Sequence, residues 1–163
     1  MHFIDLSRLP KGRKITYLRT VVAFRAQKAD PYCIRWTVGG NLVDYPGVVY
    51  TPSANLATIK LLLNSIISTK NARFVNIDIK DFYLNTPMSR YEYMWVPVEL
   101  IPRDIFDEYK LAGLVSNNKV LVEIRKGMYG LPQAGRLAYE KLVEHLAKGG
   151  YIPTGLTPGL FKH

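Results

Sequence analysis

Segments with the composition of β-strands recur along this chain and constrain its fold more than any other feature. Two of them are separated only by the basic stretch RAQKADP, which predicts a β-hairpin with a basic loop. The strand-like segments are residues 15–24, 32–40, 74–79, 91–98 and the stretch after Asn118. These segments predict an antiparallel sheet.

Apolar residues recur at helical spacing in other parts of the chain. Ser53 can cap a helix over about residues 54–68, which we expect to pack under the sheet. Pro132 suits the first turn of a helix that runs to about residue 148, and a short helix is expected over about 104–111. We therefore expect a single domain of the α+β class, with helices packed on the sheet.

The composition is that of a folded, basic protein. Apolar residues make up 48% of the 163 residues, which excludes a disordered chain. The formal net charge of +9 favours binding to nucleic-acid phosphates, although many basic proteins bind none. A single cysteine, Cys33, excludes an internal disulfide, and the sequence contains no signal peptide or membrane-spanning stretch. We expect an intracellular protein of the cytoplasm or nucleus, neither secreted nor bound to a membrane.

Asp78 lies in an otherwise apolar strand-like segment, FVNIDI. On a strand, Val75, Ile77 and Ile79 would share one face and Asp78 would lie on the other. A buried carboxylate is costly unless it is paired or binds a cation, so Asp78 is a candidate metal ligand. Asp81 follows three residues later, and a solvated strand end or a salt bridge to Lys80 explains such a pair equally simply.

The surrounding sequence favours a metal-binding role for Asp78. NIDIKDFYLNTPM, followed downstream by KGMYGLPQAG, resembles two successive motifs of the reverse transcriptases of copia-type retrotransposons. The resemblance extends from about Ile15 to Gly159. It implies reverse-transcriptase fingers and a partial palm, with the fingers hairpin and loop over about residues 11–50 and the remaining fingers and palm over about 51–163.

The resemblance implies a two-metal nucleotidyl transfer, with deoxynucleoside triphosphates and an RNA or DNA template-primer as partners. Asp78 matches the first catalytic aspartate, which binds Mg²⁺ or Mn²⁺, and Ile79 would contribute its carbonyl oxygen to the same site. Two divalent ions about 3.5–4 Å apart neutralise the charge that develops at the transferred phosphate.

Further residues match nucleotide-binding positions of the family. Asp81 and Phe82 match positions that line the pocket, and Tyr83 matches the aromatic residue that excludes a 2′-hydroxyl. Gln133 of the LPQAG motif would contact the incoming nucleotide. For Tyr83, a purely structural packing role is the alternative, with Phe82 competing for the inward face.

Basic residues complete the set of candidates. Lys28 and Arg35 match the fingers residues that hold the triphosphate, a role suited to a point charge and to a bidentate guanidinium. Arg25 and Lys126 are candidates for general contact with nucleic acid. A solvated basic surface is the alternative for all four residues.

The third motif of the family, a hairpin with two adjacent aspartates, is absent from this sequence. We expect a truncated or decayed reading frame whose exposed sheet edges favour self-association. Three alternatives stay open: a non-catalytic nucleic-acid-binding fragment, a metal nuclease built on Asp78 and Lys80 with Asp44 or Asp30, and a relic without biochemical role.

Because one aspartate cannot assemble a two-metal site, we expect the isolated chain not to extend a primer. The measurement is Mg²⁺-dependent primer extension by the purified protein. Extension that is lost in the Asp78→Asn variant would contradict the expectation.

Overall fold

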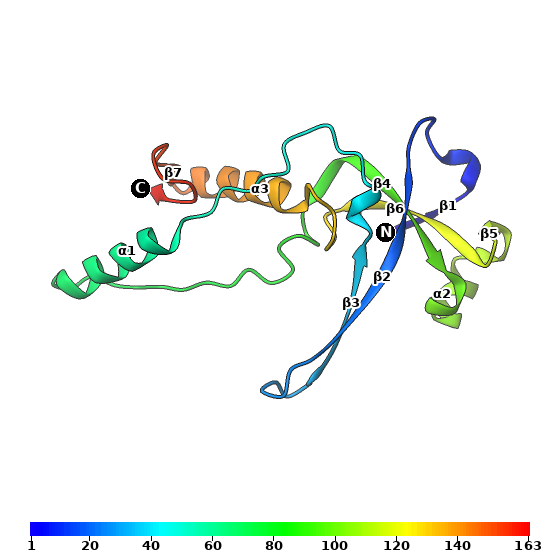
Figure 1. Ribbon diagram of the computed structural model, residues 1–163, viewed down its shortest axis with the longest axis horizontal. Helices are drawn as coiled ribbons and strands as arrows, with labels where there is room; N and C mark the ends of the chain where they lie inside the picture. The colour runs from blue at the N-terminus through cyan, green and yellow to red at the C-terminus, as the bar shows by residue number, and fades with distance from the viewer.

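A curled sheet dominated by antiparallel pairing forms the centre of the computed structural model, which describes residues 1–163 (Figure 1). In chain order the strands are β1 (His2–Ile4), β2 (Ile15–Phe24), β3 (Tyr32–Val38), β4 (Pro87–Pro97), β5 (Val115–Ser116), β6 (Lys119–Lys126), β7 (Ile152–Pro153) and β8 (Phe161–Lys162). The α-helices are α1 (Leu56–Ser68), α2 (Arg103–Glu108) and α3 (Ala134–Lys148). The α+β class predicted from the sequence is confirmed. None of the helices is both long and apolar enough to cross a membrane.

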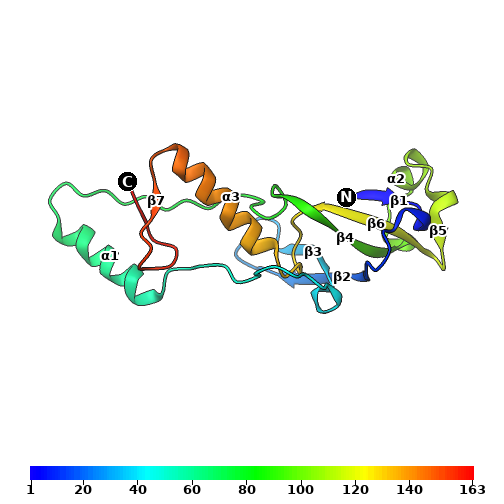
Figure 2. The ribbon, with the colours of Figure 1, turned by 90° about the horizontal axis from the view of Figure 1, so that it is seen from above.

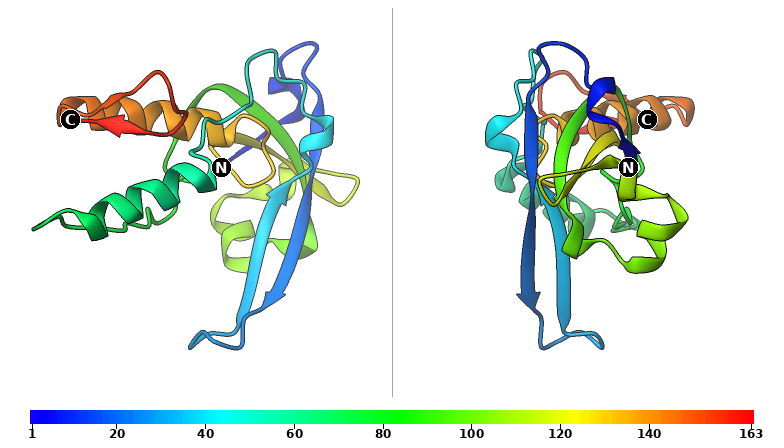
Figure 3. Two further views of the ribbon diagram at one scale, coloured as in Figure 1. Left: turned by 60° about the vertical axis from the view of Figure 1, so that its left-hand side comes forward. Right: turned by 90° about the vertical axis from the view of Figure 1, so that its right-hand side faces the viewer.

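The main sheet has the strand order β1-β6-β4-β2-β3, with β5 paired to β6. All of its pairings are antiparallel except that of β2 with β4. The predicted hairpin is β2–β3, whose register runs from Leu18 opposite Val38 to Phe24 opposite Tyr32. Its tip extends away from the rest of the sheet (Figure 3), so aromatic residues near it such as Tyr32 are exposed. Strands β7 and β8 form a separate small hairpin.

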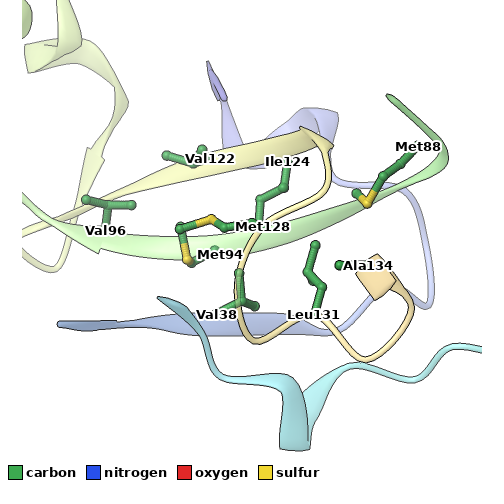
Figure 4. Close-up of a cluster of buried hydrophobic side chains, with 9 residues drawn as sticks. All are labelled: Val38, Met88, Met94, Val96, Val122, Ile124, Met128, Leu131 and Ala134. Carbon is green, nitrogen blue, oxygen red and sulfur yellow. The ribbon is translucent and has the colours of Figure 1, made fainter. Parts of the chain in front are cut away.

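The core fills the space between β3, β4, β6 and the turn that precedes α3 (Figure 4). Its buried members are Val38, Met88, Met94, Val96, Val122, Ile124, Met128, Leu131 and Ala134. Only 21 of the 163 residues are buried, so much of the chain lies outside this core. The turn 127–133 is part of the core and is therefore held firmly in place.

Gly130 allows this turn to approach β3. Its φ is +92°, and a Cβ atom at this position would lie 2.1 Å from the carbonyl oxygen of Val38. The Val38 N–H donates a hydrogen bond to the Tyr129 carbonyl, with an N···O distance of 2.8 Å. Only glycine meets both demands, positive φ and close backbone contact.

The strand predicted over residues 74–79 does not form. This segment belongs to no strand, and no backbone hydrogen bond joins residues 74–79 to the rest of the chain. No strand of the sheet pairs with this segment, and β4, the next strand along the chain, is already paired on both edges by β2 and β6. A period-two pattern needs a hydrogen-bonding neighbour before it becomes a strand.

The first predicted helix forms, but it does not pack under the sheet. Asn55, rather than Ser53, caps α1 by accepting a hydrogen bond from the Thr58 N–H at 2.8 Å. The apolar residues of α1 stay exposed, with Leu61 at 70% and Ile67 at 85% of full exposure. Helical spacing predicted the helix correctly, whereas the expected packing of its apolar side chains does not occur.

The other predicted elements differ mainly at their ends. Helix α3 begins at Ala134, two residues after Pro132, because residues 127–133 form the core turn. Helix α2 ends at Glu108, and Lys110 after it has a left-handed backbone with φ of +51°. Strand β4 begins at Pro87, earlier than the predicted start at residue 91.

Replacing Gly130 by alanine should destabilise the fold. An alanine there would have a strained left-handed backbone, and its Cβ would collide with the Val38 carbonyl oxygen. We expect the free energy of unfolding, measured by denaturant titration, to fall by about 2 kcal/mol or more. Gly113→Ala is the matched control, because a Cβ there meets nothing within 4 Å. Equal stability of the two variants would contradict the role given to Gly130.

Candidate functional site

A cavity of about 600 Å³ lies where the β2–β3 hairpin, the segment after α1 and the turn 127–133 meet. Seven residues singled out from the sequence line it: Lys28, Arg35, Asp78, Ile79, Asp81, Phe82 and Tyr83. Lys80 and Tyr129 complete the lining. Residues about fifty positions apart in the sequence are thus brought together at one site, which we call the basic pocket.

The cationic side of the basic pocket comes from the hairpin. Arg35 lies on β3, and Lys28 lies in the loop that joins β2 to β3, where its N–H donates to the Arg25 carbonyl at 3.0 Å. The Arg35 guanidinium lies over the ring of Tyr129, 5.4 Å from the ring centroid. This cation–π contact links the hairpin to the turn 127–133 and holds the Arg35 side chain at the pocket.

Aromatic rings form a second side. The Tyr83 ring meets the Tyr129 ring edge-on at a centroid distance of 5.7 Å and lies 5.9 Å from the ring of Phe82. Both Phe82 and Tyr83 are half-buried. A Cβ atom on Gly127 would come within 2.5 Å of the Tyr83 carbonyl oxygen, so this glycine allows the close contact that positions Tyr83.

A compact series of turns positions the acidic segment. Asp81 has a left-handed backbone, with φ of +53°, and its carbonyl accepts a hydrogen bond from the Asn85 N–H at 3.0 Å. The Thr86 side-chain hydroxyl donates to the Phe82 carbonyl at 2.9 Å. These bonds fix residues 81–86 just before β4, so the pocket-lining side chains arise from a defined backbone.

Asp78 is exposed at the basic pocket and has no ion-pair partner. It forms no salt bridge with Lys80, and its exposure agrees with the other alternative considered from the sequence, a solvated carboxylate, rather than with a buried one on a strand face. Its carboxylate faces solvent, which leaves its oxygen atoms available to a cation or a ligand. The pocket thus combines two carboxylates, Asp78 and Asp81, with three cationic side chains.

Oxygen atoms of Asp78, Asp81 and the Ile79 carbonyl are of the kind that Mg²⁺ and Mn²⁺ prefer. The structure contains no group of three or more acidic, histidine or cysteine side chains arranged to hold a metal ion. Mg²⁺ commonly uses only one or two protein carboxylates and takes its other ligands from water and substrate phosphates. The donor set therefore fits an ion that arrives together with a phosphate ligand.

Gln133 lies inside the core rather than at the basic pocket. Its side chain is fully buried, and its Nε2 donates a hydrogen bond to Glu92 Oε1 at 3.1 Å. Its Oε1 atom is buried without a hydrogen-bond partner. In the structure Gln133 therefore contacts Glu92 of β4. Its expected contact with a nucleotide stays a prediction.

Glu92 was not singled out from the sequence, yet it is the most deeply buried acidic residue of the chain. Its Oε2 lies 2.8 Å from Nη2 of Arg13, and Arg90 lies 3.9 Å from its Oε1. Burial raises the pKa of the Glu92 carboxyl, whereas Arg13 and the hydrogen bond from Gln133 lower it, with the effect of burial larger. Its position in the apolar run of β4 was the available signal.

The two residues proposed for general nucleic-acid contact lie outside the basic pocket. Arg25 is half-buried at the end of the hairpin, where its N–H donates to the Pro31 carbonyl at 2.7 Å. Lys126 is exposed at the end of β6 and borders a separate cavity of about 130 Å³. Their contact with nucleic acid stays a prediction.

A more apolar groove of about 740 Å³ adjoins the basic pocket and shares Arg35, Asp81 and Tyr129 with it. Its other walls are Met1, Thr20, Ile34, Trp36, Leu84, Leu100 and Met128. The charged pocket therefore continues into a surface with an aromatic and aliphatic lining.

Comparisons with protein-family models, with curated proteins and with solved structures found no match to this chain.

The contribution of Glu92 to stability should depend on pH. Because its pKa is raised in the folded state, folding favours the protonated carboxyl. The stabilising contribution is thus fully present below the unfolded pKa, near the ordinary value of 4.5, and is lost as the pH rises through the folded pKa. Wild type should therefore lose stability relative to Glu92→Gln as the pH rises from below 4.5 to neutral.

Denaturant unfolding of both proteins across this pH range measures the difference. The exposed Glu108, changed to glutamine, is the matched control and should show no such trend. A stabilising contribution of Glu92 that grows towards neutral pH would contradict the prediction, because the ion pair with Arg13 would then outweigh burial.

Proposed function

We propose that this chain is part of a copia-type retrotransposon reverse transcriptase, an RNA-directed DNA polymerase, and that the basic pocket binds a deoxynucleoside triphosphate with Mg²⁺. One observation carries the proposal. The residues chosen from the first sequence motif and from the hairpin line one cavity together with Tyr129, which lies in the second motif, although these three segments are separate in the sequence. Because residues 78–83 are neighbours in the sequence, the proposal rests on the meeting of this stretch with Lys28, Arg35 and Tyr129.

Lys28 and Arg35 would bind the triphosphate. Both cations line the side of the pocket that the hairpin forms, and Arg35 is already held by Tyr129. A guanidinium can form two parallel hydrogen bonds to phosphate oxygens, whereas an ammonium acts as a point charge. Together with Lys80 they supply the positive charge that a polyphosphate needs.

Asp78 would hold Mg²⁺, with the carbonyl oxygen of Ile79 beside it. When bound, the ion would neutralise charge on the phosphate oxygens. Asp78 is suited to this role because it is exposed at the pocket and unpaired in the protein. Asp81 begins the turn that carries Phe82 and Tyr83, so its main contribution is to shape the pocket.

Tyr83 would contact the sugar. Its ring is held between those of Phe82 and Tyr129, and its backbone lies against Gly127. A ring held in this way presents a rigid surface, which is required of a residue that excludes a 2′-hydroxyl by steric contact. The adjoining groove, with Trp36 and Met128, would accept bases of the nucleic acid by stacking and apolar contact.

A second candidate function is non-catalytic binding of nucleic acid. The net charge of +9 and the exposed aromatic rings of Phe24 and Tyr32 on the hairpin favour it. Such binding would weaken steeply with salt but would not need Asp78 or Mg²⁺. The two functions are therefore separated by their dependence on this one residue and on the metal.

Binding of a fluorescent deoxynucleoside triphosphate tests the proposal. Arg35→Ala should weaken binding by about tenfold or more, since a hydrogen bond to a charged group contributes about 1.5–3 kcal/mol. Asp78→Asn should abolish the part of the affinity that depends on Mg²⁺. Arg19→Ala is the matched control, because Arg19 is exposed on β2 outside the pocket.

Affinity equal to wild type in both pocket variants would overturn the proposal. Salt-sensitive RNA or DNA binding that is unaffected by Asp78→Asn and by removal of Mg²⁺, without any triphosphate binding, would establish the second candidate instead.

A further inference from the structure

A second cavity with cationic side chains lies between helix α3 and residues 79–86, and we call it the α3 cavity. Its volume is about 370 Å³. The chain that leads into β4 passes beside α3 at this point (Figure 2). Lys80, Lys141 and His145 are the ionisable side chains that line the cavity, and no carboxylate is among them. A lining of this kind favours an anionic ligand.

Lys141 is held at the α3 cavity by the protein itself. Its Nζ donates a hydrogen bond to the Asn85 carbonyl oxygen at 2.8 Å. An ammonium group has three donor hydrogens, so two remain for a ligand. His145 lies four residues after Lys141 on α3, and residues at this spacing are neighbours on one face of a helix. Both side chains are exposed, so both can donate to the same ligand.

The carboxylates near this part of the chain belong to other cavities. Glu140 is paired with Arg136 at 2.7 Å, and together with Glu144 these residues line a separate cavity of about 350 Å³. Asp81 lines the basic pocket and the apolar groove instead. No carboxylate therefore competes with an anion for the cationic side chains of the α3 cavity.

The remaining lining of the α3 cavity includes apolar side chains. They are Ile79, Phe82 and Leu142, of which the last two are half-buried. The volume lies near the lower end of the range for small-ligand sites, about 300–1,000 Å³. A ligand with one anionic group and one flat, apolar ring matches both parts of the lining. A nucleotide has this chemistry, because its phosphate is anionic and its base can stack on an aromatic ring.

The α3 cavity and the basic pocket share a wall. Ile79, Lys80 and Phe82 line both of them. Cationic side chains therefore continue from the β2–β3 hairpin through Lys80 to Lys141 of α3. A single strand carries a phosphate at every nucleotide, so it can contact such side chains in succession, whereas a free nucleotide cannot. This continuity favours a strand over a free nucleotide.

We propose that the α3 cavity binds one nucleotide of a single-stranded nucleic acid, with the phosphate at Lys141 and His145 and the base against Phe82. Lys80, in the shared wall, contacts the neighbouring phosphate of the strand. The site goes beyond the proposed function, because Lys141 and His145 lie outside the basic pocket and the contact needs neither Mg²⁺ nor a triphosphate.

Fluorescence anisotropy of a labelled single-stranded oligothymidylate, titrated with the full chain without Mg²⁺, tests the proposal. Lys141→Ala should weaken binding by about tenfold, because a charged hydrogen bond to phosphate is lost. The slope of log affinity against log salt concentration should become shallower by about 0.7, the value for one phosphate contact of a single strand. Lys148→Ala is the matched control, because Lys148 is exposed on α3 outside the cavity, and it should change both quantities far less.

A second variant leaves the hydrogen bond between Lys141 and Asn85 intact. His145→Ala changes an exposed side chain and should weaken oligothymidylate binding by about fivefold or more. Circular dichroism checks that each variant is folded. Triphosphate binding with Mg²⁺, measured separately, should stay at the wild-type value in His145→Ala, because His145 lies outside the basic pocket. Failure of the α3 cavity and failure of the basic pocket thus appear in different measurements.

Several results would overturn the proposal. Equal losses in Lys141→Ala and Lys148→Ala would mean that only the general charge of the protein matters. Wild-type affinity in both Lys141→Ala and His145→Ala would place the strand elsewhere. Free thymidine monophosphate that binds as tightly as the oligothymidylate would assign the cavity to a mononucleotide. The same holds for a wild-type protein that binds no oligothymidylate, since the site would then have no strand to bind.

Discussion

The contact between the turn 127–133 and strand β3 is the interaction on which the rest of the structure depends. Gly130 lets the turn lie against the Val38 backbone, and the Val38 N–H binds the Tyr129 carbonyl. The turn then contributes Met128, Leu131 and Ala134 to the core and Tyr129 to the basic pocket. One close backbone approach thus connects the stability of the fold to the geometry of the site.

Buried polar side chains also help to hold the turn 127–133 in place. Gln133 at the end of the turn is bonded to Glu92 of β4, and Glu92 is paired with Arg13 just before β2. These side chains join the turn to β4 and to the residues just before β2. The hydrogen bond of Gln133 Nε2 to Glu92 would be lost if the turn moved away from β4, although Gln133 Oε1 stays unpaired. The arrangement of Tyr129 and Arg35 at the pocket follows from the position of the turn.

Burial divides the chain into two parts: a fixed part, whose apolar side chains pack in the core, and an open part, whose apolar side chains are exposed. The core is centred on β4 and β6, whereas α1 and the segment 74–79 keep their apolar side chains exposed. The pocket lies at the junction, with Arg35 and Tyr129 from the fixed part and Asp78 from the open part.

The sequence by itself determined the α+β class, the β2–β3 hairpin and the helices α1 and α3, because periodicity and turn residues are local properties. It also supplied seven of the residues that line the pocket. Only the tertiary structure decided whether each element found a partner. The segment 74–79 alternates like a strand but forms none, since no strand of the sheet pairs with it. Gln133 lies with Glu92 inside the core. Pairing and burial depend on residues distant in the chain, and no local pattern contains that information.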